Sequence, residues 1–301
     1  MQPTSQAFIQ PQPRFEPRPL DPAHIRPRRT AFSFPTSIPT HWLEGSPVRT
    51  HFFNAINLFV VSFEDFMARV MRGRLPHLED PAFARQIRGF MGQESTHSFV
   101  HLRYLSNLRE QGFEIDGYLK AAEHIFTVWF EQRLGPRVSV AMIAGFEHLT
   151  ALLAEIILSS QLLREAEPAM AELWEWHAAE EIEHKALAFE LLKATSRSYG
   201  LRLLGAALGG LVVAGFIGVG MGMLLGQERQ LWRRRTWRDL KGLLFGPARL
   251  AVRAVSIFLE YFRPGFHPNQ RDTYALAEQV FQAKVPGGSQ AAPQEPLRAV
   301  A

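Results

Sequence analysis

The stretch WHAAEEIEH at residues 176–184 carries three side chains that can bind a metal ion on one face of a predicted helix. Glu181 and His184 form a Glu-x-x-His pair, and His177 precedes the glutamate by one helical turn. Positions three, four and seven apart share a face of an α-helix, so the three side chains point in the same direction. Because this face is set among apolar residues, the spacing predicts a buried ligand cluster rather than a solvated acidic surface.

A second Glu-x-x-His pair lies earlier in the chain, in GQESTH at residues 92–97. It consists of Glu94 and His97, and His101 continues the same face seven residues after the glutamate. One such pair is weak evidence for a site, since Glu and His are ordinary surface residues. Two pairs on separate helices are much more specific. We expect His101 to be either an additional ligand or a partner that orients a ligand.

Two single glutamates complete the set of ligands. Glu64 lies in VSFEDF at residues 61–66, and Glu147 lies in AGFEHL at residues 144–149. Carboxylate-bridged two-metal sites in helical bundles take one Glu from each of two helices and a Glu-x-x-His pair from each of the other two. Four carboxylates neutralise two divalent ions, and the imidazoles leave coordination positions open for a small molecule. The second nitrogen ligand from His177 favours redox-active iron.

Helix signals dominate the part of the sequence between residues 41 and 200. Asp80-Pro81 and Pro168 are typical helix starts, and no stretch shows the sustained alternation of a strand. We therefore expect an all-α fold, a ferritin-like four-helix bundle with a crossover helix and extra C-terminal helices. The predicted helices span about residues 50–71, 80–110, 116–133 (the crossover), 137–165 and 168–198.

Composition divides the chain into four predicted regions. Residues 1–40 are proline-rich and predict a flexible arm, whereas residues 41–200 form the di-metal bundle. Residues 201–283 contain an apolar helix and amphipathic helices that together form a membrane anchor. Residues 284–301 are small and polar, and predict a disordered tail.

The segment from Leu203 to Leu225 contains no charged residue and is long enough to cross a bilayer. Its Gly205-x-x-x-Gly209 spacing allows close approach of another helix in lipid. A further segment, about 243–262, is predicted to be an amphipathic helix that lies on the membrane or packs beside the apolar segment. The alternative is that the glycine-rich helix is buried against the bundle or against a second copy in a homodimer. Arginine and tryptophan follow, as at a cytoplasmic interface: Arg229, Trp232, Arg233, Arg234, Arg235, Trp237 and Arg238.

Overall composition excludes several classes of site. The chain of 301 residues has no cysteine, so disulfides, thiolate zinc sites and iron–sulfur clusters are excluded. The net charge of +4 comes without the aromatic and basic pattern of a nucleic-acid surface, and we expect no nucleic-acid partner. Without a recognisable secretory signal, the predicted location is cytoplasmic, on the inner face of the membrane.

The motifs resemble those of the bacterial family called predicted metal-dependent hydrolases, over about residues 40–280. The resemblance rests on PTHW at 39–42, FEDF at 63–66, GQESTH at 92–97 with His101, GFEH at 145–148, and the stretch from Trp176 to His184. The ligand order is also similar to that of the di-iron p-aminobenzoate N-oxygenases, at the metal-binding positions alone. That likeness implies these metal ligands: Glu64, Glu94, His97, Glu147, His177, Glu181 and His184. Residues 200–265 depart from the N-oxygenase pattern, so substrate and location do not transfer.

These observations predict an oxidoreductase that uses two iron ions, or manganese, to activate dioxygen. The expected substrate is an apolar organic small molecule, and an electron donor would supply reducing equivalents. One alternative is a di-metal hydrolase of an ester or phosphate, in which the ions activate a water molecule. Another is a membrane-associated protein that binds metal without catalysis.

Overall fold

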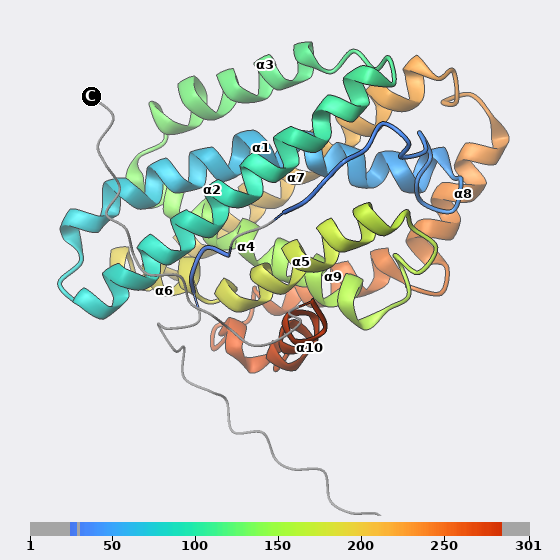
Figure 1. The fold of residues 1–301 in the computed structure, drawn as a ribbon. Helices are drawn as coiled ribbons and strands as arrows, with labels where there is room; N and C mark the ends of the chain where they lie inside the picture. Colours follow the sequence, from blue (N-terminus) through green and yellow to red (C-terminus); the bar gives the residue numbers. More distant parts are fainter. Residues whose placement is uncertain (1–24, 29–30, 285–301) are drawn as a thin grey trace, which may run out of the picture.

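The computed structural model describes residues 25–28 and 31–284, and the regular structure in these residues is helical (Figure 1). The all-α prediction is confirmed. Short 3₁₀ turns occur at Leu75–His77 and Pro268–Gln270, and a π-helix at Ile125–Glu131. The α-helices are α1 Pro47–Arg74, α2 Pro81–Glu110, α3 Asp116–His124, α4 Pro136–Ser159, α5 Pro168–His184, α6 Leu187–Thr195, α7 Tyr199–Gln227, α8 Arg234–Phe245, α9 Leu250–Glu260 and α10 Tyr274–Lys284.

Proline and capping side chains set the starts of the long helices. The α1 helix begins at Pro47, where the Ser46 hydroxyl accepts from the Arg49 N–H at 3.4 Å. Asp80 caps α2 in the same way, by accepting from the Ala82 N–H at 2.8 Å. Proline suits the first helical position because its missing N–H would have no partner there.

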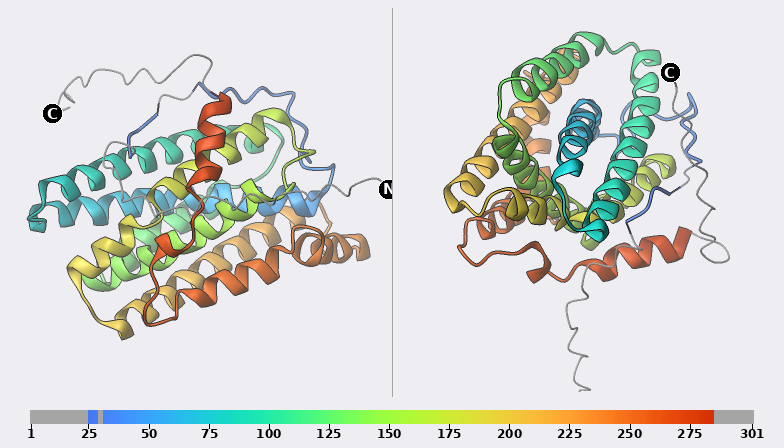
Figure 2. Two further views of the ribbon diagram at one scale, coloured as in Figure 1. Left: turned by 90° about the horizontal axis from the view of Figure 1, so that it is seen from below. Right: turned by 90° about the vertical axis from the view of Figure 1, so that its left-hand side faces the viewer.

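Helices α1, α2, α4 and α5 form the four-helix bundle, seen nearly end-on in the right-hand view of Figure 2. The α3 helix and the π-helix together make the predicted crossover between α2 and α4. The helix predicted over 168–198 is interrupted after His184, so that α5 and α6 are separate. At this break the Lys185 ammonium donates to the Arg271 carbonyl at 2.5 Å and to the Thr273 hydroxyl at 2.9 Å. The preceding helix ends at Ser159 instead of 165.

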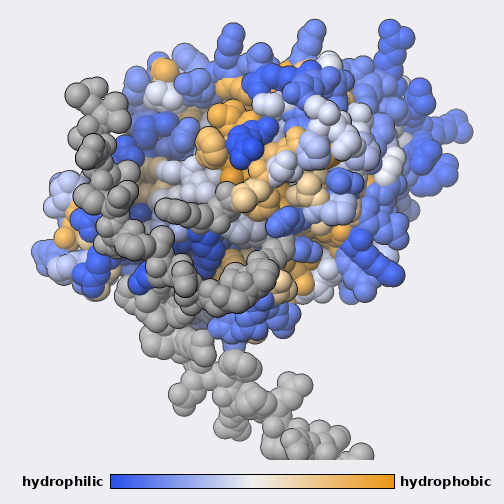
Figure 3. Space-filling model, viewed as in Figure 1, coloured by the Kyte–Doolittle hydropathy of each residue, from blue (hydrophilic) through white to orange (hydrophobic). Residues whose placement is uncertain are grey.

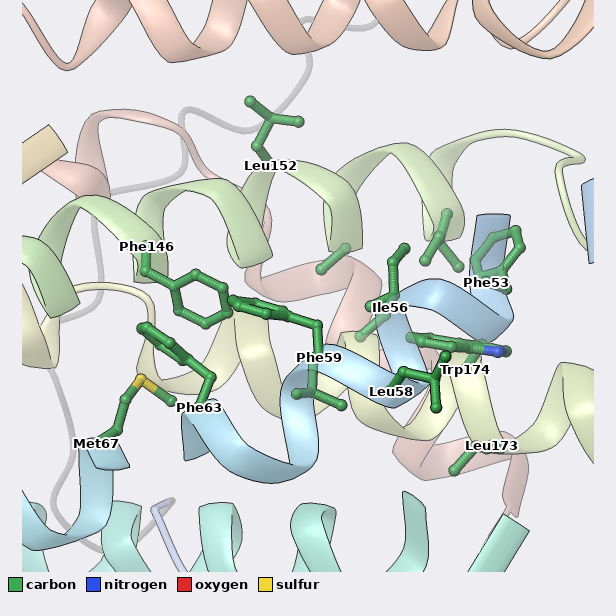
Figure 4. Packing of buried hydrophobic residues seen from close by; sticks show 14 of the residues in the cluster. Phe53, Ile56, Leu58, Phe59, Phe63, Met67, Phe146, Leu152, Leu173 and Trp174 are labelled. Atoms are coloured by element: carbon green, nitrogen blue, oxygen red, sulfur yellow. The ribbon is translucent and has the colours of Figure 1, made fainter. Parts of the chain in front are cut away.

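A cluster of phenylalanines from α1 and α4 packs in the core of the bundle (Figure 4). The rings of Phe59 and Phe63 lie 5.2 Å apart, and those of Phe63 and Phe146 lie 3.8 Å apart. All three are buried. Because Phe63 and Phe146 directly precede Glu64 and Glu147, their packing fixes the register of α1 and α4 at the site.

The glycine-rich helix α7 belongs to the same packed unit as the bundle. A Cβ atom at Gly145 of α4 would lie 2.5 Å from the Cα of Ala206, and one at Gly205 would lie 2.2 Å from the Ala141 carbonyl oxygen. Side chains from α7 and from the bundle share one core. The boundary predicted at residue 200 therefore does not separate two packing units, and the close approach expected of this helix is made to α4.

Part of the predicted N-terminal arm lies on the bundle. Ile25 is buried, and a Cβ at Gly89 of α2 would lie 2.1 Å from its carbonyl oxygen. Where it is described, this segment is therefore packed in place against α2. Residues 1–24 and 29–30 of the predicted arm, and 285–301 of the predicted tail, lie outside the described residues.

Candidate metal centre

The eight side chains predicted to form the site are all buried, each at most 5% exposed. They come from four helices and meet inside the bundle. Three of them are contributed by α2, three by α5, and one each by α1 and α4: Glu94, His97, His101; His177, Glu181, His184; Glu64; and Glu147.

One group of four side chains has potential ligand atoms within 4.8 Å of one another. It consists of the two Glu-x-x-His pairs, Glu94 with His97 and Glu181 with His184. The Nε2 atom of His184 lies 3.1 Å from Glu94 Oε1, and Nδ1 of His97 lies 3.6 Å from Glu181 Oε1. The spacing expected from sequence is thus realised as a single cluster between α2 and α5.

The outer hydrogen bonds of the two imidazoles determine which nitrogen faces the cluster. His97 donates from Nε2 to Glu180 Oε2 at 2.9 Å, which leaves its Nδ1 facing inward. His184 donates from Nδ1 to Glu147 Oε2 at 3.0 Å, which leaves its Nε2 facing inward. Such carboxylate partners fix the tautomer and orientation of metal-binding histidines.

A second group lies beside the first and consists of Glu64, His101 and His177. Asn57 donates from Nδ2 to a main-chain carbonyl, so its Oδ1 accepts from His101 Nδ1. His101 Nε2 is then an acceptor for His177 Nδ1, at 2.7 Å. As a result His177 presents Nε2 to Glu181, at 3.0 Å, and to Glu64, at 4.0 Å.

Glu147 lies outside both groups of potential ligand atoms. One of its oxygens accepts from His184, and the other, Oε1, is buried without a hydrogen-bond partner among the described residues. The structure therefore places Glu147 where it orients His184 while its second oxygen stays free. Glu181, in contrast, is close to imidazoles of both groups.

The pKa values of the buried carboxyl groups are those of a site that would bind cations. Burial raises the pKa of Glu64 and Glu94 well above the usual carboxyl value, and raises the pKa of Glu147 to about 7. Burial acts on Glu181 as well, yet His184, His177 and His97 together hold its pKa well below the usual value. Carboxylates in such surroundings become fully charged when cations are present.

An outer layer of charged residues supports the centre. Its main member, Arg28, was not predicted from the sequence. Arg28, from the segment predicted to be flexible, donates to Glu180 Oε1 at 2.7 Å and to both Glu183 oxygens at 2.6 and 2.7 Å. Glu180 in turn orients His97, and Gln93 also donates to Glu183 at 2.8 Å. Glu180 and Glu183 are both buried.

Buried nitrogen and oxygen atoms without a hydrogen-bond partner test whether these residues could hold a metal ion. Several inward-facing atoms are buried without a hydrogen-bond partner among the described residues: Glu64 Oε2, Glu94 Oε2, His97 Nδ1 and Glu181 Oε2. Buried polar atoms are normally satisfied, so this concentration points to a missing partner. Imidazole and carboxylate donors suit iron, manganese or zinc, and two adjacent groups suit a pair of ions.

Comparison with known families indicates a metal-dependent protein. The sequence profile of the family described as "Predicted metal-dependent hydrolase" matches residues 26–272, most of the chain. The chain belongs to this family. No curated protein and no solved structure matches it. In this member of the predicted metal-dependent hydrolases, the matched region begins close to Arg28 and ends just after Arg271, so it includes the N-terminal segment as well as the bundle.

Proposed function

We propose that this predicted metal-dependent hydrolase is a carboxylate-bridged di-iron, or manganese–iron, oxidase or oxygenase. The observation that carries the proposal is the pair of adjacent ligand groups. Glu181 of the first group lies 3.0 Å from His177 of the second, and buried nitrogen and oxygen atoms without a hydrogen-bond partner among the described residues face the space between the helices. Reduced iron held there would supply the electrons that activate dioxygen, and the carboxylates would stabilise its oxidised state.

The surroundings of the centre favour a small apolar co-substrate such as dioxygen. The Phe90 ring lies 4.7 Å from the His184 ring, and the Trp176 ring lies 4.9 Å from the His97 ring. These aromatic side chains exclude water from the imidazoles, while Glu147 and Glu180 hold the imidazoles in place. A dry, fixed site protects a strong oxidant from side reactions.

Hydrolysis of an ester or phosphate is the second candidate function. It is supported by the family description and by a donor set that also accepts zinc, which would activate a water molecule. A hydrolase must admit both water and a polar substrate to its ions. The potential ligands here are almost completely buried, which favours dioxygen chemistry over hydrolysis.

Metal analysis followed by an anaerobic experiment separates these functions. We expect protein purified without added metal to contain about two iron or manganese ions per chain, as such bundles hold. After reduction, rapid mixing with dioxygen is expected to produce a transient visible absorption band and oxidation of the metal. Turnover of esters or phosphates by zinc-loaded protein, with no reaction of the ferrous protein, would favour the hydrolase. Metal binding with neither reaction would indicate a non-catalytic metal protein.

We also propose that the protein lies on the inner face of a membrane through α7 and α9. Two described helices, α4 and α7, are long and apolar enough to span a bilayer. A third candidate span arises if α8 and α9, which meet at a bend, are counted together. The apolar window of α4 is 78% buried within the protein, whereas that of α7 is only 22% buried. Since α7 packs against α4 and α1, a position in the interface explains its exposed side better than a crossing does.

The exposed side of this region has the composition of a membrane-contacting surface. We call it the apolar flank, and it is formed by large side chains on α7 and α9: Leu204, Leu211, Val219, Val252, Val255 and Leu259. Next to it, Trp232 and Trp237 are exposed near the arginines at 233–235 and 238. Arginine and tryptophan at the edge of an apolar surface favour anionic lipid headgroups.

Cell fractionation without detergent tests the membrane location. We expect the protein in the membrane pellet, and release by high salt to be incomplete, because apolar contacts persist when charges are screened. Recovery of all the protein in the supernatant would contradict the proposal.

The opposite face, with α2 and α5, is mostly hydrophilic around a band of apolar side chains (Figure 3).

A further inference from the structure

A cleft of about 920 Å³ opens at the end of the bundle, away from the candidate metal ligands. Its walls come from the start of α2, from α6, from the start of α7 and from the loop after α9. None of the eight potential metal ligands lines this cleft. It is therefore a separate site, and its chemistry can be considered without reference to the metal.

The charges that line the cleft do not balance. Its two acids are already engaged, because Asp80 caps α2 and Glu190 pairs with His267 at 2.5 Å and with Lys193 at 3.2 Å. Arg197 and Arg202 also line the cleft. Among the described residues, no carboxylate lies within ion-pair distance of either. Two carboxylates, one lysine and two arginines line the cleft, so with a neutral histidine it has a formal excess of one positive charge.

Arg202 is the more informative of the two, since it is only 8% exposed. One of its nitrogens donates to the Arg263 carbonyl at 2.5 Å, and its Nε has no hydrogen-bond partner among the described residues. The rings of Tyr199 and Tyr261 lie 4.8 and 5.5 Å from the guanidinium carbon and offset part of its charge. A cation buried to this degree is normally paired with an anion.

Two further features of the cleft favour a negatively charged ligand. The 29-residue helix α7 begins here, so the positive end of its dipole faces the same region as Arg197 and Arg202. The remaining lining includes the aromatic rings of Phe83, Phe189 and Phe266, which would contact an apolar group. From Arg202, α7 leads within one turn to Leu204 and the apolar flank.

We infer that this cleft binds the carboxylate or phosphate group of an amphiphilic small molecule, with Arg202 and Arg197 as its cationic contacts. The anion supplies the missing counter-charge of Arg202, and the aromatic wall takes the adjacent apolar portion. The position of the cleft at the end of the apolar flank allows such a molecule to enter from a membrane. The inference does not depend on the oxidase proposal.

Calorimetric titration of the full-length, delipidated protein tests the site with three probes. These are inorganic phosphate, octanoate, and monomeric dihexanoyl phosphatidate below its micelle concentration. We expect the two amphiphiles to bind and Arg202→Met to weaken them by about tenfold or more, because a charge-assisted contact is lost. Arg202→Lys retains the charge and should restore most of the binding.

A second substitution keeps the test decisive if Arg202→Met does not fold. Arg197 is exposed, so Arg197→Gln leaves packing intact and is expected to weaken binding severalfold. The matched control is Arg164→Gln, an exposed arginine outside the cleft whose side chain donates to Gln161. Its affinity should equal that of the wild type.

The outcomes distinguish the sources of the anion. Binding of inorganic phosphate as tightly as phosphatidate would assign the site to a free anion, whereas binding of amphiphiles alone would assign it to lipid or fatty acid. In both cases the arginine substitutions must reduce the affinity. Absence of binding by all three probes, or equal affinity in wild type, Arg202→Met and Arg197→Gln, would overturn the inference. Repeating the titration with metal removed should leave the result unchanged.

Discussion

The ligand cluster inside the bundle and the apolar flank on its surface both depart from the pattern of a water-soluble protein, because the first buries charged side chains and the second exposes apolar ones. Inside, four carboxylates and four imidazoles are buried among aromatic rings. Outside, α7 and α9 expose leucine and valine side chains such as Leu211, which is 72% exposed. Each region is unfavourable by itself, the first because buried charge is costly and the second because apolar surface contacts water.

Each region would be stabilised by a different partner. Cations would compensate the interior, and lipid would cover the flank. The two regions are therefore expected to respond to different changes: loss of metal binding should leave membrane binding intact, and the reverse should also hold.

The largest effect is expected from Glu181→Gln. Glu181 Oε1 lies 3.0 Å from His177 and 3.6 Å from His97, so it contacts both ligand groups. Removing its charge should abolish binding of both ions, measured by elemental analysis, without changing the membrane fraction. The control is Glu110→Gln, an exposed acid at the end of α2. A full complement of metal in Glu181→Gln would contradict the assignment.

Arg28→Gln should weaken metal binding by about 10- to 100-fold, the usual loss when an outer partner of a ligand is removed. The substitution leaves Glu180 and Glu183 without their cation, and His97 loses a firmly held acceptor. Competition with a chelator measures the affinity. Arg26→Gln is the matched control, because Arg26 is exposed and contributes its main-chain carbonyl, which the substitution keeps. Equal affinities in both variants would show that the segment has no positioning role.

Leu211→Glu should reduce binding to anionic vesicles by about tenfold, because a charge on the apolar flank opposes burial in lipid. Its metal content should stay at the wild-type level. Leu102→Glu places the same charge at an exposed leucine of α2 and should have little effect on vesicle binding. If Leu102→Glu reduces vesicle binding as much as Leu211→Glu does, the contact surface is wrongly placed.

A smaller effect should appear in the pH dependence of the apoprotein. Burial raises the pKa of Glu147 to about 7, whereas in the unfolded chain this carboxyl has the ordinary value of 4.5. Between these values the unfolded chain has released the proton and the folded protein retains it, so rising pH reduces stability. Glu147→Gln removes this titration. Its free energy of unfolding should therefore improve relative to wild type from pH 4.5 to 7, by about 3 kcal/mol. A difference that does not vary with pH would refute this.

The sequence predicted the helices and the positions of Glu94, His97, Glu181 and His184 because helical periodicity alone places a Glu-x-x-His pair on one face. The same periodicity, with apolar neighbours, indicated Glu64 as an inward residue. Local spacing contains enough information for contacts of this kind.

Contacts between distant segments could not be predicted in this way. The prolines around Arg28 indicate extended backbone but do not indicate the surface on which it lies, so its contacts with Glu180 and Glu183 were missed. Likewise the role of Asn57 depends on how α1 and α2 face each other. The glycine spacing in α7 predicted close packing, yet it could not identify α4 as the partner.

The contact between Gly145 and Ala206 has a practical consequence for preparing smaller versions of the protein. Truncation before α7, at the end of the bundle suggested by composition, would uncover the backbone of α4 two residues from Glu147. The fragment would lose one wall of its interior together with the α7 part of the apolar flank. Expression designs that aim at crystals should therefore retain α7 and replace surface leucines and valines on its outer side.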